Sequence, residues 1–426
     1  MGVKVAVAGG GSTYTPELIE GFLSHADRLP VDELVLFDID PDRLEVVGGL
    51  AKRILAKREW PGNLVLTGDR DRALDGAGFV IIQLRVGGQA ARLSDETLPL
   101  EFGCIGQETT GPGGFAKALR TVPVVLDLAE ETERRGAKDA WIVDFTNPVG
   151  IVMQALLDEG HHAIGLCNSA MGFQRQIARL LDVDPSRVAL EHVGLNHLTW
   201  ERAARVDGVD RLPELIARSA DVIGNEIGIP ADLIRLLGAI PSYYLRYFYL
   251  TDEVLRDQTS GTKRSRAEEV MAIEAELLEM YRDPHLDSKP KLLEQRGGAY
   301  YSEAAAQLIA SLHAGTGDDQ VVDIRNEGAL PDLPDDAVVE IPARIELDGA
   351  HPRHLDALPS EMLGLVQQVK AYERLTVRAA IDGDRKTALK ALLANPLIGQ
   401  YPVASVLLDA LLEANRNHLS RFFPRG

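Results

Sequence analysis

The sequence predicts an α/β protein in which a Rossmann-like, doubly wound parallel sheet is followed by a mainly helical α+β region. An apolar strand-like run, Val3–Ala8, leads directly into three glycines and then a helical pattern. Further strand-like runs alternate with helical patterns up to residue 195, as in a parallel sheet with crossover helices; they begin near residues 33, 64, 79, 140 and 162. Beyond residue 195 helical patterns dominate, and strand-like runs occur only at 320–324 and 337–347.

Each helix is predicted from apolar residues that recur every three or four positions. In the first half these patterns lie at 18–23, 43–57, 115–134 and 173–181, and in the second half at 212–218, 267–280, 302–312, 361–381, 385–393 and 403–415. The polar, glycine-rich segment Arg85–Gly114 shows no such period, so we expect a long ordered loop there.

Composition narrows the class of protein. The chain has 426 residues, enough for two domains with large cores. Its net charge of −19 argues against nucleic acid or an anionic membrane as partner, so we expect a small-molecule ligand. Two cysteines do not make a disulfide framework, and the chain starts in a strand without a signal peptide. We therefore expect a cytoplasmic protein.

The opening predicts a dinucleotide site. Residues 9–17 read Gly-Gly-Gly-Ser-Thr-Tyr-Thr-Pro-Glu between a strand and a helix, where glycines permit a tight turn and the helix N-terminus favours a pyrophosphate. Asp38 ends the next strand, and a carboxylate there favours NAD over NADP. The alternative is a simple tight turn with Asp38 as a helix cap. The candidate cofactor-binding residues are Gly9, Gly10, Gly11, Ser12, Thr13, Asp38 and Arg43.

Two further residues predict a metal site. Cys167 follows the apolar run 163–166, and His197 follows the strand-like run 188–195. Ligands bind at the carboxyl ends of strands in open α/β sheets, so the thiolate and the imidazole could meet there on a divalent ion. The alternative is a small buried cysteine and a structural histidine.

The segment 240–249 holds four of the ten tyrosines, including Tyr244. They either form an aromatic packing cluster or provide a phenol whose pKa a nearby metal lowers enough for it to act as a base. Arg85 and Arg92, in the polar segment, either contact a sugar or a phosphate or form surface salt bridges.

Taken together, these residues resemble glycoside hydrolase family 4, the NAD- and metal-dependent glycosidases, and above all its 6-phospho-β-glucosidases. The resemblance runs nearly the full length. The matching motifs are Gly9–Glu17, Asp95-Glu96, Gly106–Gly111, Asp144–Pro148, Cys167-Asn168, Gly194–His197, Tyr244–Tyr247, Arg296–Gly298 with Tyr301-Ser302, and Arg325–Leu330 before Leu333–Asp336.

The resemblance implies a role for each matching residue. Cys167 and His197 hold Mn²⁺ or another divalent metal, and Tyr244 is the catalytic base. The substrate-binding residues are Arg92, Asn147, Asn168 and Arg266. Members that cleave α-linkages carry Asp where this chain has Asn168, so the resemblance implies a β-linked, phosphorylated glucoside as substrate.

The implied reaction uses NAD without net oxidation. Carbon 3 of the sugar loses a hydride to NAD⁺, the metal polarises the resulting ketone, and Tyr244 removes the proton on carbon 2. The group at carbon 1 is then eliminated, water adds, and the hydride returns. The resemblance further implies an NAD-binding domain at 1–195, an α+β substrate-binding and oligomerisation domain at 196–426, and a homodimer or homotetramer.

Three other interpretations stay open. A 2-hydroxy-acid dehydrogenase would share the first domain, but it would leave Cys167 and Tyr244 unexplained. A non-catalytic NAD sensor would not need Cys167, His197 and Tyr244 together. Within the family, the third is 6-phospho-α-glucosidase activity, α-galactosidase activity or hydrolysis of an unphosphorylated glycoside.

Overall fold

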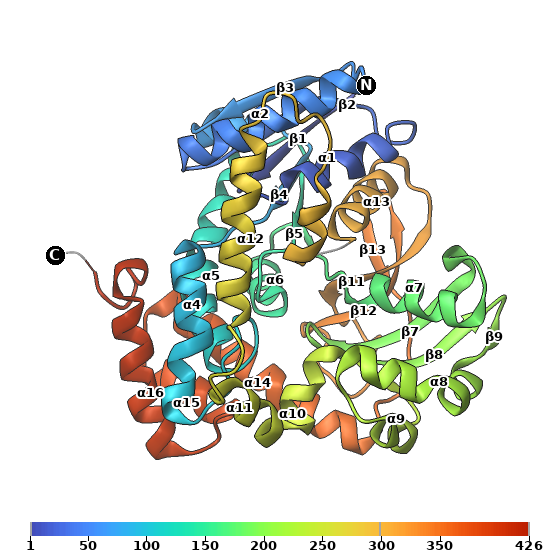
Figure 1. Cartoon of the computed structure of the whole chain (residues 1–426), viewed down its shortest axis with the longest axis vertical. Helices are drawn as coiled ribbons and strands as arrows, with labels where there is room; N and C mark the ends of the chain where they lie inside the picture. The colour runs from blue at the N-terminus through green and yellow to red at the C-terminus, as the bar shows by residue number, and fades with distance from the viewer. Residues whose placement is uncertain (1, 298–299, 425–426) are drawn as a thin grey trace.

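The centre of the molecule is a nine-stranded sheet (Figure 1). The computed structural model describes residues 2–297 and 300–424. In these residues the strand order is β13-β12-β11-β6-β5-β4-β1-β2-β3. The strands are β1 (Val3–Ala8), β2 (Val31–Phe37), β3 (Asn63–Thr67), β4 (Phe79–Ile82), β5 (Trp141–Asp144), β6 (Ala163–Gly165), β11 (Asp318–Arg325), β12 (Val338–Glu346) and β13 (Gly349–Pro352).

The first six strands confirm the predicted doubly wound sheet. They pair in parallel in the order β3-β2-β1-β4-β5-β6, so the strand order reverses between β1 and β4. All four residues of β4 are buried, as expected of a strand with helices on both faces. The carboxyl ends of β1, β4, β5 and β6 therefore line one edge, where ligands bind in such folds.

Strands from the second half complete this sheet. β11 pairs antiparallel with β6, Asp323 lying opposite Gly165, and β12 and β13 extend the sheet further. The sequence pattern located β11 and β12 but not their place in the sheet. The division at residue 195 stays a prediction, and the main sheet takes strands from both sides of it.

A second, antiparallel sheet carries the predicted metal-binding histidine. It consists of β7 (Val188–Leu195), β8 (Leu198–Val206), β9 (Val209–Asp210) and β10 (Ile240–Pro241). The sequence pattern missed β8, because its buried positions include the charged Glu201, which contacts the buried His192 with 2.6 Å between Oε1 and Nδ1. A buried ion pair removes the apolar alternation from which strands are recognised.

The prediction of a long loop at Arg85–Gly114 was wrong. The segment contains α4 (Gly88–Thr97) and a 3-10 helix (Leu98–Phe102). The buried side chains of α4 are charged, and Asp95 forms a two-bond contact of 2.9 and 2.7 Å with the buried Arg120. Buried charges give no apolar period, so this helix is invisible to hydrophobic patterning.

Helices cover both faces of the main sheet, and the second sheet packs through β7 directly against β12 of the main sheet (Figure 1). The long α12 (Arg266–Tyr281) runs beside α2 (Pro41–Lys57) and α4. No helix within residues 2–297 and 300–424 is long and apolar enough to cross a membrane. The remaining helices are α1 (Thr15–Ser24), α2 (Pro41–Lys57), α3 (Arg70–Leu74), α5 (Gly111–Arg135), α6 (Val149–Asp158), α7 (Ser169–Leu181), α8 (Leu212–Ile227), α9 (Ala231–Leu237), α10 (Arg246–Tyr249), α11 (Thr251–Thr259), α12 (Arg266–Tyr281), α13 (Tyr301–Ala314), α14 (Ser360–Asp382), α15 (Arg385–Ala394) and α16 (Tyr401–Ala414).

Candidate active site

The glycine turn after β1 is packed tightly against the ends of its neighbouring strands. Gly9 has φ +88°, and a Cβ there would lie 2.5 Å from the Gln83 carbonyl oxygen. A Cβ on Gly10 would lie 2.7 Å from the Cβ of Leu36. Any side chain at either position would push the turn away from β2 and β4. The glycines thus keep bare backbone at the strand ends, which is what a pyrophosphate needs to approach.

Asp38 and Arg43 lie on either side of this turn. The Asp38 carboxylate accepts the backbone N–H groups of Gly11 at 2.8 Å and Asp40 at 3.0 Å. The Arg43 Nε donates to the Gly11 carbonyl at 3.2 Å. These contacts place the predicted cofactor residues around one turn, with a carboxylate at the end of β2.

Glu274 lies in α12, far from the turn in the sequence, but its carboxylate contacts the turn directly. It accepts from the Thr13 hydroxyl at 3.1 Å and from Arg43 at 3.2 Å, and Arg296 lies 3.4 Å away. These cations lower the Glu274 pKa. The hydroxyl of Ser12 accepts the Tyr14 N–H at 3.2 Å. The Thr13 hydroxyl is therefore bonded to α12, a role for Glu274 that no motif in the sequence indicated.

Cys167 and Asn147 follow neighbouring strand ends, at β6 and β5. The phenol of Tyr301, at the start of α13, interacts with both side chains. Burial, together with nearby carboxylates, raises the pKa of the Cys167 thiol well above its usual range. The Asn147 Oδ1 is buried without a hydrogen-bond partner in the chain. A buried acceptor of this kind costs free energy unless a ligand satisfies it, so Asn147 fits a substrate-binding role.

His197 occupies a strained position between β7 and β8. Leu195 and Leu198 pair directly, which leaves Asn196 and His197 as a two-residue turn. His197 has φ +63°, in the left-handed region that favours glycine. Such a backbone conformation costs of order 1–3 kcal/mol and is typical of functional sites. The strain therefore supports a role for the imidazole itself.

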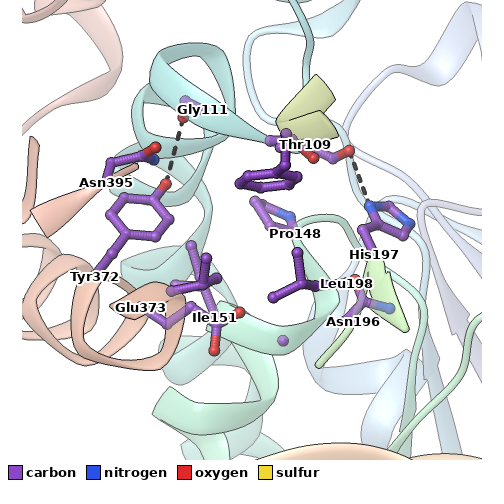
Figure 2. A pocket seen from close by; sticks show the side chains of 14 residues that line it. Thr109, Gly111, Pro148, Ile151, Asn196, His197, Leu198, Tyr372, Glu373 and Asn395 are labelled. Carbon is purple, nitrogen blue, oxygen red and sulfur yellow. Dashed lines mark hydrogen bonds between the residues drawn. The ribbon is translucent and has the colours of Figure 1, made fainter. Parts of the chain in front are cut away.

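The surroundings of His197 suit a metal ligand. Burial lowers its pKa to about 4, so the ring is neutral near pH 7. Its Nδ1 lies 3.0 Å from the Thr109 hydroxyl, and Figure 2 shows the two side chains pointing toward each other. A hydrogen bond to Nδ1 leaves Nε2 to bind a metal. The cavity in Figure 2, of about 30 Å³, lies beside this pair and is large enough for one water molecule.

Tyr244 borders both metal-ligand candidates. Its ring stacks on His197, with centroids 3.6 Å apart and planes 11° apart. Burial raises the Tyr244 pKa well above its usual value, and a negative charge on Cys167 raises it further. Without a cation the phenol stays protonated, and a nearby cation would lower its pKa. The structure thus brings Cys167, His197 and Tyr244 together.

The donor set leaves room for a ligand on the metal. Within the described ranges, no third cysteine, histidine or carboxylate lies close enough to share an ion with Cys167 and His197. A thiolate and an imidazole suit a divalent transition metal. Two protein donors would leave the other coordination positions to substrate or water, so the residues present fit such an ion.

Arg92 lies in a buried cationic cluster around Glu108. Its guanidinium is 2.8 Å from Glu96 and 3.3 Å from Glu108. Lys117 lies 2.7 Å from Glu108, and Arg85 also pairs with it. These cations hold the pKa of Glu108 well below its usual range. Cations outnumber carboxylates here, one residue from Thr109, so the cluster favours an anionic ligand.

Arg266 and Asn168 differ in their placement. Arg266 begins α12, and its half-exposed guanidinium contacts Glu269 at 3.0 Å and the Gln295 carbonyl at 2.7 Å. The structure therefore does not bring the Arg266 side chain to Tyr244. Asn168 is the N-cap residue of α7, directly after Cys167. Gly298, from the predicted motif at 296–298, lies outside the described residues.

Family models match most of the chain. A model of the "Family 4 glycosyl hydrolase" family matches residues 4–183, and a second model, of the C-terminal domain of that family, matches residues 192–398. The chain belongs to glycosyl hydrolase family 4. This confirms the family predicted from the motifs and does not favour a dehydrogenase.

Family 4 relatives match over the full length. A probable 6-phospho-β-glucosidase from Bacillus subtilis is 43% identical, covering 99% of this chain and 98% of the relative. The structure of the 6-phospho-β-glucosidase from Thermotoga maritima with manganese, NAD⁺ and glucose 6-phosphate has a TM-score of 0.92 at 36% identity, covering 98% and 99% of the two chains. A 6-phospho-α-glucosidase from gut microorganisms, solved with NAD and glucose 6-phosphate, has a TM-score of 0.90 at 28% identity, covering 98% and 99%.

Proposed function

We propose that this protein hydrolyses 6-phospho-β-glucosides with the help of NAD and a divalent metal. The observation that carries the proposal is the placement of Tyr244, stacked on His197 and bordering Cys167. A partly buried phenol beside two metal-ligand candidates has no use in a simple dehydrogenase. It is what a reaction needs that removes a carbon-bound proton next to a metal-polarised carbonyl.

Each active-site residue has its own role in the proposed reaction. Bound NAD and metal would supply the hydride acceptor and the Lewis acid. Tyr244 removes the proton on carbon 2 of the sugar, and His197 and Cys167 hold the ion. Asn147 offers its unpartnered oxygen to a sugar hydroxyl. Arg92 and its cluster attract the anionic substrate. We keep Arg266 as a substrate contact that would require its side chain to leave Glu269.

The β-linkage is proposed on Asn168. A neutral amide cannot donate a proton as a carboxylic acid does, so this chain lacks a general acid directly after Cys167. The resemblance places an aspartic acid at this position in members that cleave α-linkages, so the amide favours the β-linkage. The matches of higher identity, at 43% and 36%, bear the 6-phospho-β-glucosidase name.

The proposal also covers the oligomeric state and the location in the cell. We propose a homodimer or homotetramer, because the C-terminal helices carry exposed apolar side chains such as Tyr401 and Val406, 62% and 54% exposed. We also propose a cytoplasmic location, since the buried Cys104 and Cys167 are both free thiols.

The function is tested by release of nitrophenol from p-nitrophenyl β-glucoside 6-phosphate. The assay contains NAD⁺, Mn²⁺ and a thiol, and each is then omitted in turn. We expect release that disappears without NAD⁺ or metal, with no net formation of NADH. Accumulation of NADH would instead indicate a dehydrogenase. Cleavage of only the α-linked phosphate would keep the family and overturn the role of Asn168.

A further inference from the structure

An open hollow lies directly beside the proposed active site. It has a volume of about 540 Å³ and is bordered mainly by α7 and the end of α8. This volume falls within the range of about 300–1,000 Å³ that is typical of small-molecule sites. Three of its lining residues are sequence neighbours of active-site residues: Ser169 follows Asn168, Tyr243 precedes Tyr244, and Tyr300 precedes Tyr301. Three segments of the chain thus contribute residues both to the site and to the hollow, and the Tyr243 ring contacts that of Tyr244.

The walls of the hollow are polar but carry paired charges. Arg175 forms an ion pair with Glu303 at 2.5 Å, and its guanidinium covers the Tyr300 ring at 4.3 Å. Arg179 forms an ion pair with Glu226 at 2.8 Å. Each arginine thus has its own carboxylate. This contrasts with the cluster around Glu108, where cations are in surplus, and it favours an uncharged occupant.

Tyr243 presents an aromatic surface at the mouth of the hollow. Tyr243 is 41% exposed although its ring contacts the partly buried Tyr244 edge-on, with centroids 5.7 Å apart. Arg246 lies over the Tyr243 ring at 4.5 Å, which holds it in place. A fixed, exposed aromatic ring stacks well on a flat apolar face, such as an aryl group or the C–H face of a sugar.

We propose that this hollow receives the aglycone, an uncharged leaving group with a flat apolar face. The proposal rests on the proposed function, since it concerns the part of the same substrate that lies beyond carbon 1. The two halves of the substrate would then lie in regions of different charge. Its phosphorylated sugar faces the cations around Arg92, and its neutral half lies against Tyr243 and Tyr300.

Gly172 offers a way to fill the hollow without strain. It lines the hollow from within α7, and a Cβ at this position would meet no atom within 4 Å. The variant Gly172→Trp therefore puts an indole into the space claimed for the aglycone. Gly364→Trp is the matched control, because Gly364 lies in α14, is exposed, and has equally open surroundings.

The test compares three β-glucoside 6-phosphates for wild type and both variants. Their leaving groups are methanol, p-nitrophenol and a glucose linked through its O4. In Gly172→Trp we expect kcat/KM for the two large leaving groups to fall at least about tenfold relative to the methyl substrate. Gly364→Trp should keep the wild-type ratios. Tyr243→Leu, which removes the aromatic face, should raise KM for the large substrates relative to the methyl one and serves if Gly172→Trp does not fold.

The outcomes separate the two proposals. Equal losses on all three substrates, or unchanged ratios in both Gly172→Trp and Tyr243→Leu, would overturn the aglycone site while leaving the function intact. A wild-type protein that cleaves none of the three glycosides would overturn the proposed function, and the aglycone site with it.

Discussion

The imidazole of His197 and the phenol ring of Tyr244 lie face to face, 3.6 Å apart between centroids. The His197 ring is buried and the Tyr244 ring is partly buried, so a cation held by His197 would act on the phenol through a poorly screened environment. The stack links metal binding to proton removal. It explains how a tyrosine whose pKa burial raises could still serve as a base once the cation is bound.

We expect Tyr244→Phe to abolish exchange of the carbon 2 proton with solvent and to reduce turnover by at least about 10²-fold, because no other phenol of the described residues stacks on His197. NAD binding should be unchanged. The measurement is deuterium incorporation at carbon 2, followed by NMR. Tyr247→Phe is the control, since Tyr247 packs in the same aromatic group 6.4 Å from Tyr244. Full turnover in Tyr244→Phe would show that another group is the base.

We expect Thr109→Val to weaken metal binding by about 10–100-fold, because the Thr109 hydroxyl is the group that orients His197 through Nδ1. Titration with Mn²⁺ measures the change. Thr110→Val is the neighbouring control: Thr110 is more buried than Thr109, but the Thr110 hydroxyl has no contact with His197 among the hydrogen bonds of the described residues. Equal effects of both variants would indicate a packing defect.

We expect metal binding to release one proton, from the Cys167 thiol. The pKa of this thiol is raised and that of His197 is about 4, so between these values only the thiol must ionise. The apparent affinity should therefore rise about tenfold per pH unit from about pH 6 to 9, without levelling. Calorimetry in buffers of different ionisation enthalpy counts the proton. Cys104→Ser should preserve the slope, whereas a flat profile would mean that Cys167 does not bind as a thiolate.

We expect Glu108→Gln to destabilise the fold by about 3–5 kcal/mol, because Arg85, Arg92 and Lys117 would lose their common carboxylate. Urea unfolding measures the loss. The pKa of Lys117 is already lowered to about 8, and it should fall further in the variant. Between that lowered pKa and the unfolded-state pKa of about 10.4, the lysine binds more protons in the unfolded state than in the folded one. The free energy of unfolding of the variant should therefore increase as the pH rises through this range.

An exposed pair provides the control for this prediction. Glu413 contacts Arg416 at 2.8 Å, but both side chains are more than half exposed. Glu413→Gln should therefore change stability by less than about 1 kcal/mol. If the two glutamine variants were equally stable, the cluster around Glu108 would not contribute as a buried charge network.

The parallel sheet could be predicted from sequence because its strands are buried on both faces. Phe79–Ile82, for example, is a continuous apolar run. The pattern failed where buried positions are charged, as at Asp95 in α4 and Glu201 in β8. It also could not show that Asp323 lies opposite Gly165, because nothing local in the sequence specifies pairing across such a separation.

The site was predictable to the extent that its residues follow strands or glycine turns. Cys167 and Asn147 lie at strand ends, as expected, and His197 follows a strand, although one from the second sheet. The supporting residues were not predicted as such. Thr109 and Tyr301 stood inside recognised motifs without a role, and Glu274 reaches the glycine turn only through folding, 261 positions away from Thr13.

Because β11 pairs with β6, the main sheet can be completed only late in synthesis of the chain. The strand that covers β6 is made about 150 residues after it, so at about 5–20 residues per second the growing chain leaves this edge unpaired for roughly 8–30 s. An unpaired edge invites association with other chains, and short edge strands limit that hazard. β6 is only three residues long. The brevity of that strand thus protects the nascent protein during the interval in which its central sheet is still incomplete.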